Sequence, residues 1–251
     1  MTESLKDNLI VNSNLSLAWA EAFFKVLDAP GGEVVPIIVQ VNNINNQEPD
    51  EIQEIREKLD ALHRKLETGL RCETTAGTIF PKSYWTPSRP RETLYERYKE
   101  NWPKIRKCKQ NKHGTYFYRF INYQDKYNQL EHVIETWKKD NHRRSALIAS
   151  VFDPTYDHTD CRQRGFPCLQ QVSFVPHSDG SLSVNAFYAK QDIFPYAYGN
   201  YLGLCRLGLF MASELGFKFD KMTCFSGIMN FGGRAKRNFD ELRQQIIAIT
   251  S

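Results

Sequence analysis

The strongest pattern of apolar and polar positions in the chain lies between Pro49 and Gly69. Its apolar residues recur at alternating spacings of three and four, which places them on one face of an α-helix. They are Ile52, Ile55, Leu59, Leu62 and Leu66. Asp50 can cap the start of this helix, and Gly69 can end it. We predict a helix packed on a core; a coiled-coil partner helix is the alternative, although the repeat covers only about two and a half heptads.

Four further segments show a helical pattern. They are Leu15–Val26, Tyr127–Lys139, Asn200–Leu215 and Phe239–Ile247. The third is apolar on nearly every side, so we expect it to be buried and to end at Gly216. The segment Ser83–Lys112 is polar, contains prolines and is rich in Lys and Arg, which favours a loop with a short helix.

Short apolar and β-branched runs predict the strands. They are Val34–Val41, Tyr116–Ile121, Ala146–Phe152, Leu169–Val175, Ser181–Tyr188 and Thr223–Ile228. Pro36 marks the first of them as an edge strand or a bulge, and Asp179-Gly180 predicts a tight hairpin turn. Because no internal repeat or linker divides the chain, we predict one α+β domain over residues 1–251. Its large mixed sheet is flanked by helices.

Composition narrows the class of protein only a little. An apolar content of 41% and a charged content of 25% are typical of a globular protein. The net charge of +4 suits an anionic small ligand as well as a nucleic acid. No pattern of basic and aromatic residues resembles an RNA-recognition motif, so we expect a small-molecule ligand rather than a nucleic acid.

The cysteines and the first residues bear on location. No run reaches the roughly 18 apolar residues of a membrane span, and Met1–Ser13 lacks the apolar centre of a secretory signal. The six cysteines form no CxxC pair, which indicates reduced thiols rather than disulfides or a metal site. We therefore expect a cytoplasmic protein with no membrane partner and at least one thiol free for chemistry.

The segment from Arg143 to Asn200 holds the candidate chemistry. In order, it contains Arg143-Arg144, Pro167-Cys168, the hairpin, Asp192, and Gly199-Asn200 at the start of the apolar helix. This order and the eight-residue interval from Asp192 to Asn200 resemble thymidylate synthase and its pyrimidine hydroxymethylase relatives. Residues 111–230 form the part that matches best, and residues 1–110 are diverged.

The resemblance implies a thymidylate synthase-like fold, in which two sheets pack back to back in a symmetric homodimer. It also implies an enzyme that transfers a one-carbon unit, methyl or hydroxymethyl, to carbon 5 of a pyrimidine nucleotide or modified nucleotide. The expected donor is 5,10-methylenetetrahydrofolate. Addition of a thiolate to carbon 6 of the ring makes carbon 5 nucleophilic, which is the reason for a cysteine in such a site.

Roles carried over from the family fall on matching residues. Cys168 is the expected nucleophile, and nearby positive charge would favour its thiolate. Asp192 is associated with the folate pterin or with later proton transfers. Asn200 would read the edge of a uracil-type base, because its amide can both donate and accept. Arg143 and Arg144 would reach a phosphate across the dimer interface.

Two further contacts are expected from neighbouring positions. Lys190 stands beside the phosphate-binding position of the family and would supply a point charge there. One of Tyr116 or Tyr118 could order water near the pyrimidine ring. Tyr116 and Tyr118 also have a structural interpretation, as part of a core strand.

The other candidate residues keep alternatives as well. Cys168 is compatible with a buried small residue, and Asp192 with a cap on a turn. Asn200 is compatible with a helix N-cap. Arg143 and Arg144 are compatible with a solvated surface pair.

Several positions depart from the family pattern. Leu169 and Ser173 replace a His and a Gln near the cysteine, and Ala189-Lys190 replaces an Arg-Ser pair. A His-x-Tyr pair that holds the sugar is absent from Ile228–Gly233. Sugar and phosphate recognition must therefore differ, and ordinary dTMP synthesis is not expected. The alternative class is a non-catalytic nucleotide-binding or interaction module on the same fold, for example in phage defence.

Overall fold

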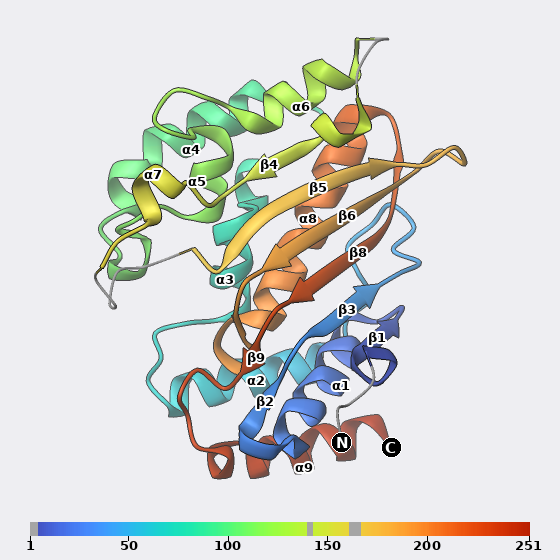
Figure 1. The fold of residues 1–251 in the computed structure, drawn as a ribbon, viewed down its shortest axis with the longest axis vertical. Helices are drawn as coiled ribbons and strands as arrows, with labels where there is room; N and C mark the ends of the chain where they lie inside the picture. The colour runs from blue at the N-terminus through green and yellow to red at the C-terminus, as the bar shows by residue number, and fades with distance from the viewer. Residues whose placement is uncertain (1–4, 140–142, 161–166) are drawn as a thin grey trace.

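The computed structural model describes residues 5–139, 143–160 and 167–251 and is built around a six-stranded mixed sheet (Figure 1). In spatial order the strands are β1 (Leu9–Asn12), β3 (Ile37–Val41), β8 (Lys218–Ser226), β6 (Ser181–Tyr188), β5 (Leu169–Pro176) and β4 (Ile148–Ser150). The β1–β3 and β6–β8 pairs are parallel, and the other pairs are antiparallel. A large mixed sheet, as predicted, is confirmed.

A second, small sheet lies at one end of the large one. Its order is β2 (Glu33–Val34), β9 (Met229–Asn230) and β7 (Gln191–Asp192). The parallel β7–β9 pair sets Asp192 beside Asn230. This pairing fixes the backbone around one of the expected site residues.

Helices cover one face of the large sheet and gather at its β4 edge (Figure 1). In chain order they are α1 (Leu15–Asp28), α2 (Gln53–Lys65), α3 (Cys72–Ile79), α4 (Glu92–Ile105), α5 (Tyr116–Ile121), α6 (Gln129–Trp137), α7 (Pro154–Asp157), α8 (Tyr198–Leu215) and α9 (Asp240–Thr250). The helix α8 packs against the sheet, and α3 packs against α8. The buried apolar side chains belong to one continuous core cluster.

Close packing of α8 depends on glycines along its length. A Cβ at Gly203 would lie 2.7 Å from the Ala76 carbonyl oxygen in α3. One at Gly208 would lie 2.3 Å from the ring of Phe219 in β8. The missing side chains therefore let α3 and the sheet approach this helix from different sides. The prediction of a buried helix ending at Gly216 is confirmed, since Gly216 takes the left-handed conformation (φ +78°) at the C-cap.

The opposite face of the large sheet carries no helix from the described part of the chain in Figure 1. Leu9 and Val11 of β1 and Phe187 of β6 are exposed. The Phe187 ring stacks on Phe225 of β8, with centroids 5.4 Å apart. We call this surface the open sheet face.

The predicted strand Tyr116–Ile121 is wrong, because these residues form the helix α5. Aromatic and β-branched residues favour strands on average, but the Thr115 side chain accepts a hydrogen bond from the Tyr118 amide (3.1 Å) and caps a helix. Phe117, Phe120 and Ile121 are then buried together, at the spacing of a helical face.

The prediction of a loop with a short helix over Ser83–Lys112 is also wrong in its proportions. It contains the 14-residue α4, which buries Leu94, Tyr95 and Tyr98 and includes Pro103. Because most residues of this segment are polar or charged, the apolar stripe was not recognised in the sequence. The shorter α3 and the strand β1 were not predicted either.

Two predicted elements differ in their ends. The helix expected over Pro49–Gly69 spans only α2, with Ile52 rather than Asp50 at its N-cap position. The strand expected over Val34–Val41 divides at Pro36 into β2 and β3. Because β3 pairs with β1 and β8, it is an inner strand rather than an edge. In the ranges that the structure describes, none of the helices has the length and apolar content needed to cross a membrane.

Candidate functional site

Cys168 lies directly before β5, where the β5–β6 hairpin ends. Its carbonyl oxygen accepts a hydrogen bond from the Ala189 amide (3.1 Å), which extends the β5–β6 pairing by one residue. The Gln170 side chain donates to the Pro167 carbonyl oxygen (2.6 Å). The backbone is thus fixed on both sides of the cysteine, while the residue is exposed and its thiol is free.

Three tyrosines and one aspartate lie within electrostatic reach of the thiol. The pKa values of Tyr116, Tyr188 and Tyr196 are raised first by burial, and the Cys168 charge contributes to each. Tyr116 is hydrogen-bonded to the backbone of Leu169, and its ring lies edge-on to Tyr188 with centroids 6.4 Å apart. Asp192 acts on the thiol in turn. We call Cys168, Tyr116, Tyr188, Asp192 and Tyr196 the thiol site.

The electrostatics of the thiol site oppose ionisation of the sulfur. Although the residue as a whole is exposed, protein packed around the sulfur desolvates it, and this desolvation is the largest cause that raises the pKa of Cys168. The Asp192 carboxylate raises it further. Lys190 acts in the other direction, but its ammonium group lies 2.9 Å from Asp192 and is paired with it. At neutral pH the protonated thiol therefore dominates. The expectation of strong positive charge beside the cysteine is not met by the described residues of this chain.

The chain after β9 closes over Asp192. Gly232, with φ +65°, brings its backbone so close that a Cβ there would lie 2.8 Å from the Asp192 carboxylate. Arg234 follows, with its guanidinium 5.8 Å from the centroid of the Phe194 ring, and it lowers the pKa of Tyr196 against the effect of burial. Gly232 and Arg234 were not predicted from the sequence as site residues, although a Gly-Gly-Arg run after a strand is a visible signal.

Asn200 lies inside α8 rather than at its cap, because the helix begins at Tyr198. The N-cap interpretation is therefore wrong. Tyr196 of the thiol site precedes Asn200 by four residues, about one helical turn. Asn200 is 3% exposed, and none of the hydrogen bonds within the described ranges uses its side chain. Its amide is a buried polar group that remains available to a ligand.

Beneath the thiol site lies a buried polar cluster. The Ser226 hydroxyl donates to the Gln191 side-chain oxygen (3.0 Å), and Cys224 lies beside both. Considering the described residues alone, the Tyr188 and Tyr201 hydroxyls and the Gln191 amide nitrogen have no hydrogen-bond partner. Unpaired buried donors are costly, so this cluster is a second indication that polar groups meet here for a purpose beyond packing.

Arg143 and Arg144 are remote from the thiol site of the same chain. The Arg144 guanidinium donates to the Pro176 carbonyl oxygen (2.5 Å), at the far end of β5 from Cys168. A strand rises by about 3.3 Å per residue, so the two ends of β5 are roughly 25 Å apart. Only a second copy of the chain could bring these arginines to the thiol.

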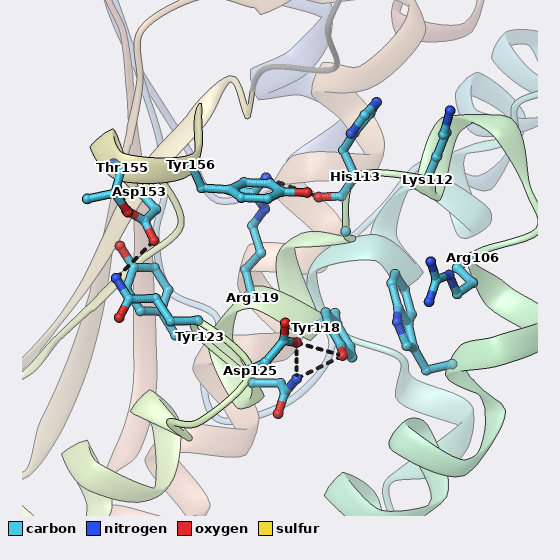
Figure 2. Close-up of a pocket in the computed structure, with 14 residues that line it drawn as sticks. Arg106, Lys112, His113, Tyr118, Arg119, Tyr123, Asp125, Asp153, Thr155 and Tyr156 are labelled. Carbon is cyan, nitrogen blue, oxygen red and sulfur yellow. Dashed lines mark hydrogen bonds between the residues drawn. The ribbon is translucent and has the colours of Figure 1, made fainter. Parts of the chain in front are cut away.

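Tyr118 belongs to a different place from Tyr116. Its ring stacks on Trp102 with centroids 3.9 Å apart, and its hydroxyl donates to Asp125 (3.3 Å). Tyr118 lines a cavity of about 560 Å³ that Figure 2 shows. We call it the basic cavity. It is lined by Trp102, Arg106, Lys112, His113, Gly114, Tyr118, Arg119, Asn122, Tyr123, Gln124, Asp125, Asp153, Thr155 and Tyr156.

Clusters of His, Cys, Asp and Glu that could hold a metal ion are not found among the described residues. A search of protein-family models gives no match, and neither does a search of curated proteins. The residues and their geometry therefore carry the functional conclusion.

Proposed function

We propose that this chain is a thymidylate synthase-like enzyme that transfers a one-carbon unit, methyl or hydroxymethyl, to carbon 5 of a pyrimidine nucleotide or modified nucleotide. The single observation that carries the proposal is that Asp192 and Tyr116 both lie within electrostatic reach of the free thiol of Cys168, an exposed residue. These residues are far apart in the sequence. Two of them are also the residues that the resemblance assigns to catalysis.

The proposed chemistry begins with a protonated thiol. The sulfur adds to carbon 6 of the ring as its proton leaves, and Asp192 is the carboxylate within electrostatic reach that can accept this proton. The addition makes carbon 5 nucleophilic towards a one-carbon donor. The buried Asn200 amide would pair with N3–H and O4 of a uracil-type ring and so select the base.

The resemblance implies 5,10-methylenetetrahydrofolate as the donor, and the chemistry of Asp192 fits such a group. One carboxylate oxygen of Asp192 is paired with Lys190, and the other oxygen keeps acceptor capacity for the N–H groups of a pterin. When bound, the folate would supply the one-carbon unit. The part of this chain is to orient it through Asp192, next to the thiol.

Recognition of the phosphate would use groups other than those of the family. The ammonium group of Lys190 already forms an ion pair with one carboxylate oxygen of Asp192. Arg234 lies within electrostatic reach of Tyr196 in the thiol site and has no ion pair with the residues that the structure describes. We propose Arg234 as a phosphate contact, since its planar fork suits that anion better than a lysine does.

A homodimer would complete this arrangement. The open sheet face exposes Leu9, Val11 and Phe187, which a second sheet could cover. Back-to-back packing of two sheets would also give Arg143 and Arg144 a place near the partner's ligand. Sedimentation at micromolar concentration tests this part: a monomer would remove the proposed role of both arginines.

The function is tested by trapping the covalent adduct. We expect a 5-fluoropyrimidine nucleotide with 5,10-methylenetetrahydrofolate to add the mass of both ligands to the intact protein. Cys168→Ala should abolish the adduct. Cys108→Ala is the matched control, because Cys108 is also exposed and free but lies outside the thiol site. An unmodified wild-type protein across a panel of pyrimidine and modified nucleotides would overturn the proposal.

A non-catalytic nucleotide-binding module is the second candidate, favoured by the raised pKa of Cys168. In that case a uridine nucleotide should raise the melting temperature equally in wild-type protein and in Cys168→Ala, with no covalent adduct in either. Asn200→Ala should reduce the shift, because base reading at the thiol site is common to both candidates.

A further inference from the structure

The basic cavity lies away from the thiol site, and its charged groups fall into two kinds. Arg119 is buried and fully engaged: it makes two hydrogen bonds to Asp157 (2.6 and 2.9 Å) and one each to the carbonyl oxygens of Val151 and His113 (both 3.0 Å). This arginine holds α5 to α7 and cannot also serve a ligand.

Arg106 and Lys112 are the second kind. Both line the cavity, both are exposed, and neither side chain forms an ion pair or hydrogen bond with the residues that the structure describes. Figure 2 shows them on the side of the cavity opposite Asp153. They are the cations that an anionic group entering the cavity would meet.

The sequence around these two cations strengthens their field. From Asn101 to Gln124 there are six lysine and arginine residues and no acid. The net charge of the whole chain is only +4, so this stretch is a local concentration of positive charge. Such a region attracts anions before contact is made.

Aromatic side chains form the walls between the charged ends. Trp102 and Tyr118 are stacked with ring planes 14° apart. The Tyr156 ring lies above Arg119, whose guanidinium is 5.7 Å from the ring centroid. Figure 2 shows Tyr156 extending across the cavity towards His113. Flat aromatic surfaces of this kind bind planar rings.

Hydrogen-bond acceptors line the remaining side of the basic cavity. Asp125 accepts hydrogen bonds from Asn122 (2.9 Å) and Tyr118, and Asp153 accepts from Gln124 (3.0 Å) and Thr155. Carboxylates keep further acceptor capacity for hydroxyl or amino groups of a ligand. Asp125 and Asp153 would also repel a second phosphate, which disfavours a nucleic-acid strand whose charges continue across the cavity.

We infer that the basic cavity is a second ligand site, which binds a nucleotide. Its phosphate lies between Arg106 and Lys112, its ring lies against the aromatic walls, and its sugar or amino groups donate to Asp125 or Asp153. The volume of about 560 Å³ lies within the range of small-molecule sites. This site does not depend on the chemistry of Cys168.

Calorimetric titration of the full chain tests the site, with uridine and adenosine 5′-monophosphates as probes. Arg106→Gln/Lys112→Gln should weaken the binding by about tenfold or more, since two charge-assisted contacts are lost. Lys104→Gln/Lys109→Gln is the matched control: it removes the same charge from the same exposed stretch but from positions that do not line the cavity. We expect the control to bind within about twofold of wild type, apart from a small long-range effect.

Three further titrations test where the nucleotide binds and which of its parts are recognised. Asp192→Asn/Asn200→Ala should leave this binding unchanged, which separates it from any nucleotide held at the thiol site. Inorganic tripolyphosphate and the free nucleosides should bind more weakly than the nucleotides, because each lacks one half of the ligand. Equal binding of tripolyphosphate, tighter binding of a short single-stranded oligonucleotide, or an unaffected Arg106→Gln/Lys112→Gln variant would each overturn the inference.

Discussion

The thiol site and the basic cavity share the short helix α5 but have opposite electrostatic character. Tyr116 at the start of α5 belongs to the thiol site, whereas Tyr118 and Arg119 line the cavity. In an α-helix, residues two apart point about 200° away from each other, so one turn can serve both places. The thiol site gathers hydroxyls and a carboxylate, whereas the cavity places two exposed cations, Arg106 and Lys112, opposite its aspartates.

The reactive thiol and the cations that could bind an anion therefore lie at different places in the molecule. The positive charge that would stabilise a thiolate is concentrated in the cavity and at Arg143 and Arg144, neither of which reaches Cys168 within one chain. The thiol site instead opposes ionisation of its sulfur, because burial and the Asp192 carboxylate both raise the pKa of Cys168. In the proposed reaction, a substrate or a second subunit would supply the positive charge that the described residues do not place beside Cys168.

The largest expected effect concerns the two kinds of cation in the cavity. Arg119→Gln should destabilise the fold by about 3–5 kcal/mol, because Asp157 would be left as a buried charge without its partner. Arg106→Gln should change stability by no more than about 0.5 kcal/mol, since that side chain is exposed. Unfolding in urea measures both. Similar losses in the two variants would remove the distinction between structural and ligand-binding cations.

A second prediction concerns the pH dependence of the free energy of unfolding, which we attribute in part to the buried His63. His63 is 2% exposed and stacks on Phe194, with ring centroids 4.6 Å apart. Burial is the largest cause that lowers its pKa to about 4, and Arg234 lowers it further. As the pH falls below about 6.5, the unfolded chain takes up this proton before the folded protein does. Stability should therefore decline between about pH 6.5 and pH 4, by on the order of 2–3 kcal/mol in total.

His63→Gln is the matched variant, because glutamine can still bond to Thr68 but does not titrate in this range. Urea unfolding at several pH values should show a shallower decline for this variant than for wild type. Parallel declines would show that His63 is not the group responsible.

The smallest expected effect is on the thiol itself. Asp192→Asn should lower the pKa of Cys168, and Lys190→Gln should raise it. The signs follow from the opposing effects of the two charges on the sulfur. The pH dependence of alkylation by iodoacetamide, followed at Cys168 by mass spectrometry, measures both. Shifts of the same sign would contradict the arrangement of charges described for the thiol site.

Sequence reasoning reached the large sheet and most helices because their apolar periodicity is local. It failed at Tyr116–Ile121, where β-prone residues are held in a helix by the Thr115 cap and by packing of Phe117 and Phe120. It also missed α4, whose buried residues are few among many charges. Both failures affected the basic cavity, since Trp102 and Tyr118 lie on these two helices.

The candidate site was predicted in part. Asp192 and Tyr116 both lie within electrostatic reach of Cys168. The order of residues along the chain selected Cys168 and Asp192, but it left Tyr116 and Tyr118 as alternatives. Tyr188 and Arg234 were not identified, because only the pairing of strands brings Tyr188 near the thiol and only the turn after β9 brings Arg234 near Tyr196. The thymidylate synthase-like fold and the dimer stay predictions.

The glycines of α8 have a consequence for how this sequence can vary. At Gly199, Gly203 and Gly208 even one methyl group would meet backbone or ring atoms closer than 3 Å. Gly77, in the neighbouring α3, has open space around it, and alanine would suit that helix better. In a library of random variants, the three α8 positions should be as restricted as any ligand-binding residue, because of packing alone. A low tolerance of substitution at a position of this chain can therefore result from close helix packing as well as from a role in chemistry.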